Sequence, residues 1–353
     1  MPRLALVMIA RNEARCIARC LDSARPHVDA MIVLDTGSTD DTVAIAEACG
    51  ATVHHFIWCD DFAAARNAAL GYSDADWNLV VDADEWLEGD ASILGPRTLP
   101  AAPVPARFVG CVRIANGDDA GTAARKFVPR ILPRGVRYEG RIHEQPVSPL
   151  PLTVLPLALR HDGFEPDQLA RKAGRNEALL RTELAAHPED SYLWFQLGRE
   201  HLVRGRAGDA ADALLTARRT GAPSDAWRHG IVVAALQALK RADRLDEALA
   251  FADAEHGLWP HSPDFYFAVA DLYLEVASRR PDLAMQEYLP VVEGAWKRCL
   301  EIGEQPGLDG SVEGCGSWLA AQNLAMFYES LGIDDDAAFY AEMGAGMRAK
   351  LAA

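Results

Sequence analysis

The sequence has no excess of basic residues, and this absence argues against one broad class of partner. Its 353 residues include 35 Lys and Arg against 51 Asp and Glu, which gives a formal net charge of −16. A protein that binds nucleic acid normally presents a basic face, so we expect no nucleic-acid partner. Half of the residues are hydrophobic and 24% are charged, as in an ordinary globular protein. A chain of this length accommodates two domains, each with its own core.

Long apolar runs and paired cysteine motifs are also missing. The apolar run that ends at Ala10 is too short to cross a bilayer, and charged residues follow it where a signal peptide would have a cleavage pattern. The seven cysteines are odd in number and include no C-x-x-C pair, which argues against a disulfide framework and a structural zinc site. Cys16 and Cys20, one helical turn apart, are interpreted as small core residues. We therefore expect a soluble, reduced, cytoplasmic protein without a membrane span.

The first eighty residues alternate between strand and helix signals. Apolar runs of strand length predict buried strands at 4–10, 30–34, 52–56 and 77–81. Helical periodicity between them predicts helices at 13–21, 40–49 and 62–70. Such alternation is typical of a parallel sheet with right-handed crossovers. Ser38 or Thr39 is expected to cap the second helix.

The character of the chain changes twice after this region. Residues 91–105 are rich in Pro and Ala and are interpreted as a loop, and strands are expected at 107–114, 127–132 and 153–159. From about residue 167 onward strand signals vanish, and Ala, Leu, Arg and Glu recur with helical periodicity. We therefore predict an α/β domain at 1–165 and an all-helical domain at 166–353.

The helical part contains a repeat. Large and small residues recur there with the spacing of the tetratricopeptide repeat, about 34 residues long. The first copy comprises Trp194, Leu197, Gly198, His201, Ala210, Leu214, Ala217 and Pro223. The last copy comprises Leu324, Ala325, Tyr328 and Ala337. Two weaker copies lie between them, one ending at 248–260 and one starting at Tyr266.

Polar and mostly acidic segments follow all four predicted strands of the N-terminal part. These segments are 10–13, 35–40, 58–61 and 82–85. Ligands of parallel α/β sheets bind beyond the carboxyl ends of the strands, so one rim is expected to gather several carboxylates. Carboxylates bind Mg²⁺ or Mn²⁺, and such a cation can stabilise a diphosphate as a leaving group. The Asp82-x-Asp84 pair is the sharpest signal; the alternative is that Asp82 caps the strand and Asp84 to Glu88 open a helix.

Taken together, these motifs resemble the family 2 glycosyltransferases of the GT-A fold. The similarity is greatest to the bacterial subgroup fused to tetratricopeptide repeats, which includes bacteriocin S-glycosyltransferases of the sublancin type. It covers about residues 3–220, and Phe164 stands where a tyrosine is expected. The matching segments are 8–13, 34–40, 60–62, 65–67, 82–85, 138–145, 161–164, 175–176 and 196–200. We therefore expect a GT-A catalytic domain with a mostly parallel, Rossmann-like sheet.

The resemblance implies a nucleotide-sugar donor, UDP-glucose or similar, and Mg²⁺ or Mn²⁺ as cofactor. It implies that Asp35 contacts the base or ribose, and that Ala10 and Asn12 line the same pocket. It implies that Asp61 and Arg66 face the nucleotide and its diphosphate. Asp35 could instead cap the turn through Gly37, and Arg66 could form an ion pair on a helix surface.

The same resemblance assigns the second half of the site. It implies that Asp82 contacts the ribose or donor sugar, that Asp84 binds the metal, and that His143 or His161 completes the metal or phosphate site. Both histidines could instead be structural strand residues. An inverting transfer to a hydroxyl needs a general base, whereas a cysteine acceptor needs less help because thiols ionise more easily. The candidate catalytic residues are Glu144, ranked first because it adjoins His143, then His143 and Glu85.

The acceptor is expected to be a peptide or protein side chain, because helical solenoids form concave peptide-binding grooves. A saccharide or lipid acceptor is an alternative, and the repeat domain could also form a homodimer. A catalytically degenerate scaffold is a further alternative, although all the strand-end carboxylates are present. An oxidoreductase is disfavoured, because no G-x-G-x-x-G motif follows the first strand.

Overall fold

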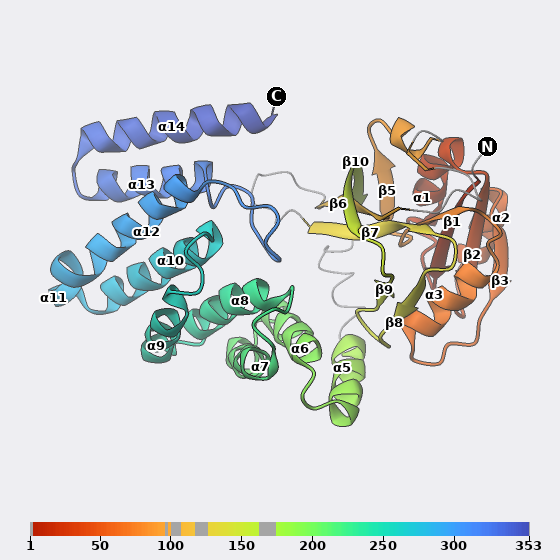
Figure 1. Cartoon of the computed structure of the whole chain (residues 1–353), viewed down its shortest axis with the longest axis horizontal. Coiled ribbons are helices and arrows are strands. Elements are labelled where there is room, and N and C mark those ends of the chain that lie inside the picture. Colours follow the sequence, from red (N-terminus) through yellow and green to blue (C-terminus); the bar gives the residue numbers. More distant parts are fainter. Residues whose placement is uncertain (1–2, 96–97, 100–106, 117–125, 162–173, 353) are drawn as a thin grey trace. The chain divides into compact units, whose positions relative to one another are not determined.

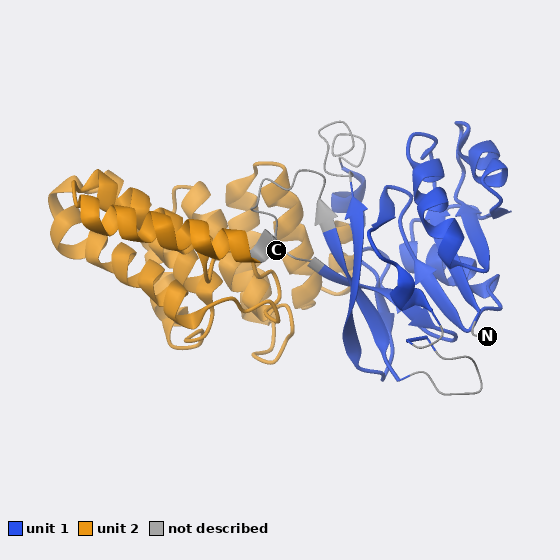
Figure 2. Cartoon of the chain, turned by 90° about the horizontal axis from the view of Figure 1, so that it is seen from above, with its two compact units in different colours: residues 1–119, 126–179 blue, residues 120–125, 180–353 orange. Residues whose placement is uncertain are grey.

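The computed structural model describes residues 3–95, 98–99, 107–116, 126–161 and 174–352. The chain divides into two compact units, residues 1–119 with 126–179 and residues 120–125 with 180–353 (Figure 2). The domain boundary expected at residues 165 and 166 lies outside the described residues. Across the described ranges, no helix combines the length and the apolar character that a bilayer crossing requires.

Four parallel strands form the first half of the sheet in the N-terminal unit. They are β1 (Leu4–Ala10), β2 (Ala30–Asp35), β3 (Thr52–His55) and β4 (Trp77–Val80), in the spatial order β3-β2-β1-β4 (Figure 1). All four strands lie within one residue of the ranges predicted from the apolar runs. Residues of β1, β2 and β4 are buried almost throughout, as expected for central strands covered on both faces.

The second half of the sheet is mixed. The order continues β4-β7-β6-β10-β5, with β7 antiparallel to β4 and β6, and β5 antiparallel to β10. The bounds are β5 (Glu85–Glu88), β6 (Val109–Asn116), β7 (Lys126–Pro133) and β10 (Leu152–His161). A separate two-stranded ribbon joins β8 (Arg137–Glu139) to β9 (Gln145–Val147). The helix considered for residues 84–88 is wrong, because β5 pairs along β10 with Glu85 opposite His161.

Three α-helices and two short 3₁₀ helices accompany the described part of this sheet. They are α1 (Ile17–Ala24), η1 (Arg25–His27), α2 (Thr42–Ala48), α3 (Phe62–Gly71) and η2 (Ser92–Leu94). The prediction that α1 begins at Glu13 is wrong, because residues 14–16 form a turn first. The expected caps of α2 are also wrong: the Asp40 carboxylate accepts from the Thr42 amide nitrogen at 3.1 Å, in place of Ser38 or Thr39.

The two faces of β1 belong to different hydrophobic cores. Leu6 and Met8 pack in the core that contains α1, whereas Ala5 and Val7 pack in the core that contains α3. Alternate side chains of a strand point to opposite faces, so one apolar run supplies both cores. This arrangement buries the strands and leaves their carboxyl ends as the polar rim.

The C-terminal unit consists of helices that pair in sequence. The helices are α5 (Arg175–Ala186), whose first residues belong to the N-terminal unit, then α6 (Ser191–Val203), α7 (Ala207–Thr220), α8 (Arg228–Arg241), α9 (Leu245–His256), α10 (Pro263–Arg279), α11 (Pro281–Leu283), η3 (Ala284–Tyr288), α12 (Leu289–Ile302), α13 (Trp318–Ser330) and α14 (Asp334–Ala352). The pairs α6–α7, α8–α9, α10–α12 and α13–α14 correspond to the four repeats predicted from the spacing (Figure 1).

Small residues allow the paired helices to approach closely. A Cβ atom added at Gly198 of α6 would lie 2.5 Å from Cγ of Leu214 on α7. Ala210 and Ala217 of α7 are fully buried in the same core. The repeat spacing therefore reflects helix contact at these positions.

Candidate active site

The carboxyl ends of β1 and β2 are joined by hydrogen bonds. The carbonyl oxygen of Ala10 accepts from the Thr36 backbone nitrogen at 2.9 Å. Asn12 adopts a left-handed backbone with φ of 58°, and its side-chain oxygen accepts from the Thr39 backbone nitrogen at 2.8 Å. A left-handed conformation at a residue other than glycine costs energy and is held by such contacts. Ala10, Asn12 and Asp35 therefore lie together at one corner of the polar rim, at the carboxyl ends of β1 and β2.

The Asp35 carboxylate lies buried in this corner. It accepts hydrogen bonds from the backbone nitrogens of Gly37 at 3.2 Å and Ser38 at 3.1 Å. The turn-capping arrangement considered from the sequence is thus present. His55, interpreted from the sequence as a strand residue without a role, has its Nδ1 atom 3.5 Å from Asp35 Oδ2. Asp35 and His55 meet because β2 and β3 pair with these two residues in register.

Asp61 and Arg66 both belong to the start of α3. Asp61 is the N-cap, and its carboxylate accepts from the Ala64 backbone nitrogen at 2.8 Å. Arg66, one helical turn further along, is 7% exposed, which rules out the surface ion pair considered from the sequence.

Arg66 bridges two carboxylates from distant parts of the chain. Its Nη2 atom donates to Asp82 at 2.7 Å, and its Nε atom donates to Glu144 in a short ion pair. Asp82 follows β4, whereas Glu144 precedes β9. The helix, the sheet and the ribbon therefore converge on one guanidinium group.

A second buried arginine, Arg130 of β7, completes the network. Its Nη2 atom donates to Asp82 at 2.9 Å and to Glu85 at 2.5 Å. The other oxygen of Glu85 accepts from the Asp82 backbone nitrogen at 3.0 Å. Asp82 is held by one arginine on each of its oxygens, so its orientation is set by the surrounding protein.

Within this network the pKa of Asp82 and the pKa of Glu85 shift in opposite directions. Burial works against ionisation of Asp82, but the neighbouring charges of Arg66 and Arg130 outweigh it and hold the pKa of this carboxyl far below its ordinary value. Burial raises the pKa of Glu85 despite the adjacent Arg130. Asp82 is therefore the more strongly ionised of the two carboxyls.

Three polar atoms beside these carboxylates are buried without a partner among the described residues. They are Nη1 of Arg66, Nε of Arg130 and the hydroxyl of Tyr138. The Arg66 guanidinium carbon lies 5.5 Å from the centre of the Tyr138 ring, and burial raises the pKa of this tyrosine. A buried donor without an acceptor is costly, so these atoms indicate a place for a bound oxygen.

Asp84 and His161, which are far apart in the sequence, lie together in the fold. Nε2 of His161 is 3.4 Å from Oδ2 of Asp84, and both side chains are mostly buried. They meet because β5 pairs with the end of β10. In the part of the chain that the structure describes, no three His, Cys, Asp or Glu side chains converge to hold a metal ion by themselves.

His143 precedes Glu144 in the loop between β8 and β9. It has a left-handed backbone with φ of 54°, which aims the following residue at Arg66. Motif residues 162–164 lie outside the described residues, whereas Asn67 of the third motif docks β8 by accepting from the Tyr138 backbone nitrogen at 2.9 Å.

Arg130 was missed by the sequence analysis, although its strand contained a signal. It is a single buried arginine between apolar residues of β7, a type of residue that is seldom buried unless it is paired. Tyr138 lay inside a recognised motif but received no role. Both come from strands whose pairing partners could not be read from local spacing.

Comparison with known proteins agrees with the motifs. Residues 5–124 match the family model of glycosyl transferase family 2. The TPR repeat-containing protein Synpcc7942_0270 of Synechococcus elongatus is 33% identical over 270 residues, which are 70% of this chain and 64% of that protein. The chain therefore spans less than two thirds of the length of this relative.

Two further proteins share parts of the chain. The SPbeta prophage-derived glycosyltransferase SunS of Bacillus subtilis is 26% identical over 299 residues, 80% of this chain and 70% of that protein. A structure of glucosyl-3-phosphoglycerate synthase from Mycobacterium tuberculosis with Mn²⁺ and UDP covers 33% of this chain and 44% of that protein, with 26% identity and a TM-score of 0.26. An overall likeness this low says nothing about the ligands of this chain.

The sheet, the helical repeats and the family match together confirm the expected fold class, a mostly parallel GT-A type sheet followed by an all-helical region. Residues 5–124 match glycosyl transferase family 2, and paired helices of the tetratricopeptide-like kind follow this domain in the chain.

Proposed function

We propose that this chain is an inverting glycosyltransferase that moves a sugar from a UDP-sugar to a peptide or protein side chain. The observation that carries the proposal is the buried network of Arg66, Asp82 and Arg130 at the carboxyl end of β4. It offers one oriented carboxylate and two arginine nitrogens without partners among the described residues. Such a set fits a ligand that presents both sugar hydroxyls and phosphate oxygens.

The nucleotide is assigned to the corner formed by Ala10, Asn12 and Asp35. Peptide groups of this corner lie at the ends of β1 and β2, where ligands of such sheets bind. The Asp35 carboxylate, whose two oxygens already accept from Gly37 and Ser38, would accept a further hydrogen bond from the base or ribose. Asp61 would act mainly through the position of α3, because its carboxylate already caps that helix.

Asp84 and His161 fit a divalent cation, Mg²⁺ or Mn²⁺. One carboxylate and one imidazole are too few to hold the ion alone, and Mg²⁺ is commonly bound by one or two carboxylates together with substrate phosphates and water. When bound, the cation would supply positive charge to the departing diphosphate. The two side chains that would coordinate the cation are already close, with 3.4 Å between His161 Nε2 and Asp84 Oδ2.

Glu144 is the best-placed general base of the three candidates. Both oxygens of Glu85 are engaged, one by Arg130 and one by the Asp82 backbone nitrogen, and its side chain is 4% exposed. Glu144 uses one oxygen for Arg66, and its second oxygen has no hydrogen-bond partner among the described residues. His143 is then a positioning residue that sets the course of the loop. A base must reach the acceptor proton, which favours the carboxylate with an oxygen to spare.

The proposed step breaks the bond between the anomeric carbon and the diphosphate oxygen. The acceptor sulfur or oxygen forms the new bond at the opposite face of that carbon, which inverts its configuration. The acceptor proton passes to Glu144, and the bonding electron pair leaves with UDP. Arg66, with a nitrogen still available, would meet the charge that develops on the diphosphate.

The test is a thermal-shift and donor-hydrolysis assay with UDP-, GDP-, CDP- and TDP-sugars, with and without Mn²⁺. We expect Mn²⁺-dependent stabilisation by the UDP compounds, and its loss in Asp84→Asn. Asp22→Asn is the matched control, since Asp22 is exposed and, within the described ranges, forms its ion pair with the exposed Arg25. No shift by any nucleotide sugar from the folded protein would overturn the proposal and favour a scaffold. Stabilisation that survives Asp84→Asn would overturn the metal assignment alone.

A further inference from the structure

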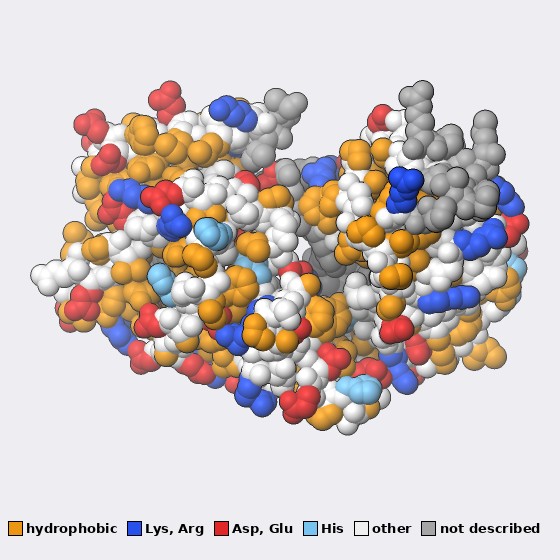
Figure 3. Space-filling model, viewed as in Figure 1, with side chains coloured by type: hydrophobic (Ala, Val, Ile, Leu, Met, Phe, Trp, Pro, Cys, Tyr) orange, Lys and Arg blue, Asp and Glu red, His pale blue; other side chains and the backbone are white. Residues whose placement is uncertain are grey.

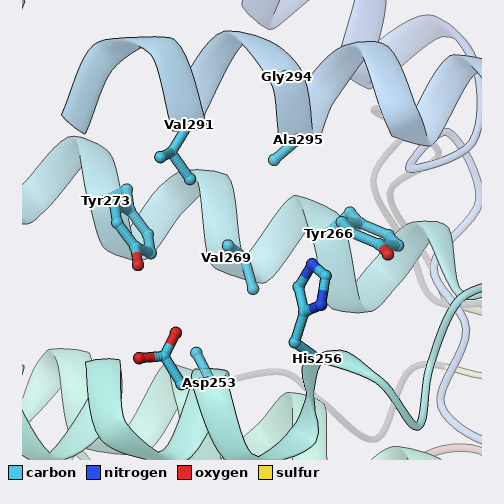
Figure 4. A pocket seen from close by; sticks show the side chains of 9 residues that line it. Asp253, His256, Tyr266, Val269, Tyr273, Val291, Gly294 and Ala295 are labelled. Atoms are coloured by element: carbon cyan, nitrogen blue, oxygen red, sulfur yellow. The ribbon is translucent and has the colours of Figure 1, made fainter. Parts of the chain in front are cut away.

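A cavity of about 580 Å³ lies within the C-terminal unit, and none of the candidate active-site residues lines it. It opens between α9, α10 and α12 (Figure 4). Its lining includes Asp253 and His256 of α9, Tyr266, Val269 and Tyr273 of α10, and Val291 of α12. The lining therefore combines an apolar middle with aromatic and charged ends.

The middle of the cavity is apolar and open. Val269 is buried and forms the floor, with Ala252 and Ala295 beside it. Gly294 on the rim has no heavy atom within 4 Å of the position of an added Cβ. An extended aliphatic chain could therefore lie over Val269 without displacing a side chain.

One end of the cavity carries a carboxylate, that of Asp253, which forms no ion pair within the described part of the chain. The side chains of Asp253 and Tyr273 point toward each other there (Figure 4). Burial and the nearby charge of Asp253 raise the pKa of Tyr273. Asp253 is exposed, and no hydrogen bond or ion pair joins it to another of the described residues.

The lysine and arginine side chains of α12, and Arg280 at the end of α10, already have partners. Arg280 pairs with Asp246 at 2.6 Å, and Lys297 pairs with Glu293 at 2.6 Å. Arg298 pairs with Glu301 at 2.9 Å. None of these three pairs includes Asp253, whose side chain lines the cavity (Figure 4).

A smaller groove over α6 provides an internal comparison. It is lined in part by Trp194, Asp209 and Asp212, and has a volume of about 250 Å³. Its acids are engaged by arginines of the chain itself: Asp212 by Arg244 at 2.6 Å and Asp209 by Arg206 at 3.9 Å. The two grooves thus differ in whether a carboxylate remains for a partner.

The surrounding charge favours a basic partner. Residues 180–353 contain 16 Lys and Arg against 27 Asp and Glu, a net charge of −11. On the face shown in Figure 3, the basic side chains of the described residues are scattered among acidic and hydrophobic ones. An excess of acidic groups attracts cationic partners over distances of about 10 Å at moderate salt.

We propose that the cavity between α9, α10 and α12 binds an arginine or lysine side chain of a basic peptide. The aliphatic stem lies over Val269, and the cationic head sits between the Asp253 carboxylate and the Tyr273 ring. Aromatic faces attract cations, and a carboxylate adds a charge-assisted hydrogen bond. That this peptide is the glycosyl acceptor rests on the proposed function, whereas the binding itself does not.

The test uses the intact chain and short fluorescein-labelled Gly-Ser peptides with a central pair of Arg, Lys, Gln or Glu residues. Fluorescence anisotropy at low salt measures the affinity for each peptide. We expect the Arg and Lys peptides to bind at least about fivefold more tightly than the Gln peptide, and the Glu peptide not to bind. Asp253→Asn should remove most of this preference, whereas Asp282→Asn, at an exposed acid of α11 outside the cavity lining, should keep it.

A second variant fills the cavity without touching a charge. Gly294→Phe places a ring in open space at the rim and should abolish binding of the Arg peptide, while Gly346→Phe on α14 should not. Thermal melting verifies that each variant is folded. Equal binding of the Arg and Gln peptides, or equal affinities of the Asp253→Asn and Asp282→Asn variants, would overturn the proposal. Donor hydrolysis, measured alongside, reports on the transferase reaction separately and is expected to be unchanged in all four variants.

Discussion

Replacement of Arg130 by methionine tests whether the buried network is held together by charge. Arg130→Met keeps most of the side-chain volume but leaves Glu85, 3% exposed, without its cationic partner. Breaking a buried ion pair by removing one partner costs about 3 to 5 kcal/mol. For a unit of this size, such a loss lowers the melting temperature by roughly 10 °C.

The loss should depend on pH in a defined direction. The pKa of Glu85 is raised on folding, so the folded state binds more protons than the unfolded state at pH values above the ordinary carboxyl pKa. The extra proton bound at Glu85 therefore stabilises the folded state at low pH, and this contribution is lost as the pH rises through the raised pKa. Without Arg130 the pKa of Glu85 rises further, so we expect Arg130→Met to lose more stability at about pH 8 than at about pH 5.

Calorimetry and amide hydrogen exchange of β4 and β7 measure the effect in the N-terminal unit. Adding Glu85→Gln to Arg130→Met should restore much of the lost stability, because no uncompensated buried charge remains there. Arg160→Met, which affects a partly exposed pair with Glu88, is the control and should cost less than about 1 kcal/mol. A loss of the same size in both arginine variants, or no rescue by Glu85→Gln, would refute the reasoning.

Three further outcomes follow from single contacts. Gly198→Ala should destabilise the helical unit by about 1 to 3 kcal/mol in thermal melts, because the added Cβ meets Leu214 at 2.5 Å, whereas Gly208→Ala in open space should not. Asp61→Ala should cost about 1 kcal/mol by removing a helix cap, and Asp61→Ser should keep the cap; a UDP-induced melting shift lost in both variants would instead indicate nucleotide contact. The pKa of Asp82 is lowered on folding, so its ionised form stabilises the protein at neutral pH, and that contribution disappears on acidification. The melting temperature should therefore fall more between about pH 5 and pH 3 in the wild type than in Asp82→Asn; parallel curves would contradict this.

The strands of the first half of the sheet and the start of α3 at Phe62 were predictable, whereas the starts of α1 and α2 were not. In an α/β sheet a short apolar run such as residues 4–10 is buried as a central strand, and β1 begins and ends where the run does. The start of α1 is different, because residues 14–16 satisfy their backbone groups in a turn before the helix begins. Local hydrogen bonding decides such boundaries, and Asp40 rather than Ser38 or Thr39 supplies it before α2.

The acidic members of the candidate site could be found from sequence because topology places them. Asp35 ends β2 and Asp82 follows β4, the two buried strands on either side of β1, and parallel strands bring their carboxyl ends to one edge. Arg130 could not be found in this way. It reaches Asp82 across 48 residues of sequence through antiparallel pairing of β7 with β4, and no local period encodes that pairing.

The sequence by itself therefore determined the two kinds of architecture, the repeat period and the acids at the strand ends, because each follows from local periodicity combined with a general rule of sheet topology. Only the tertiary structure decided which charges neutralise one another. It placed Arg66 and Arg130 on either side of Asp82 and His161 beside Asp84, and it left Asp253 without an ion pair among the residues that the structure describes. The physical reason is that electrostatic contacts depend on distances of a few ångströms between residues far apart in the chain, and those distances exist only once the sheet and the helices have packed.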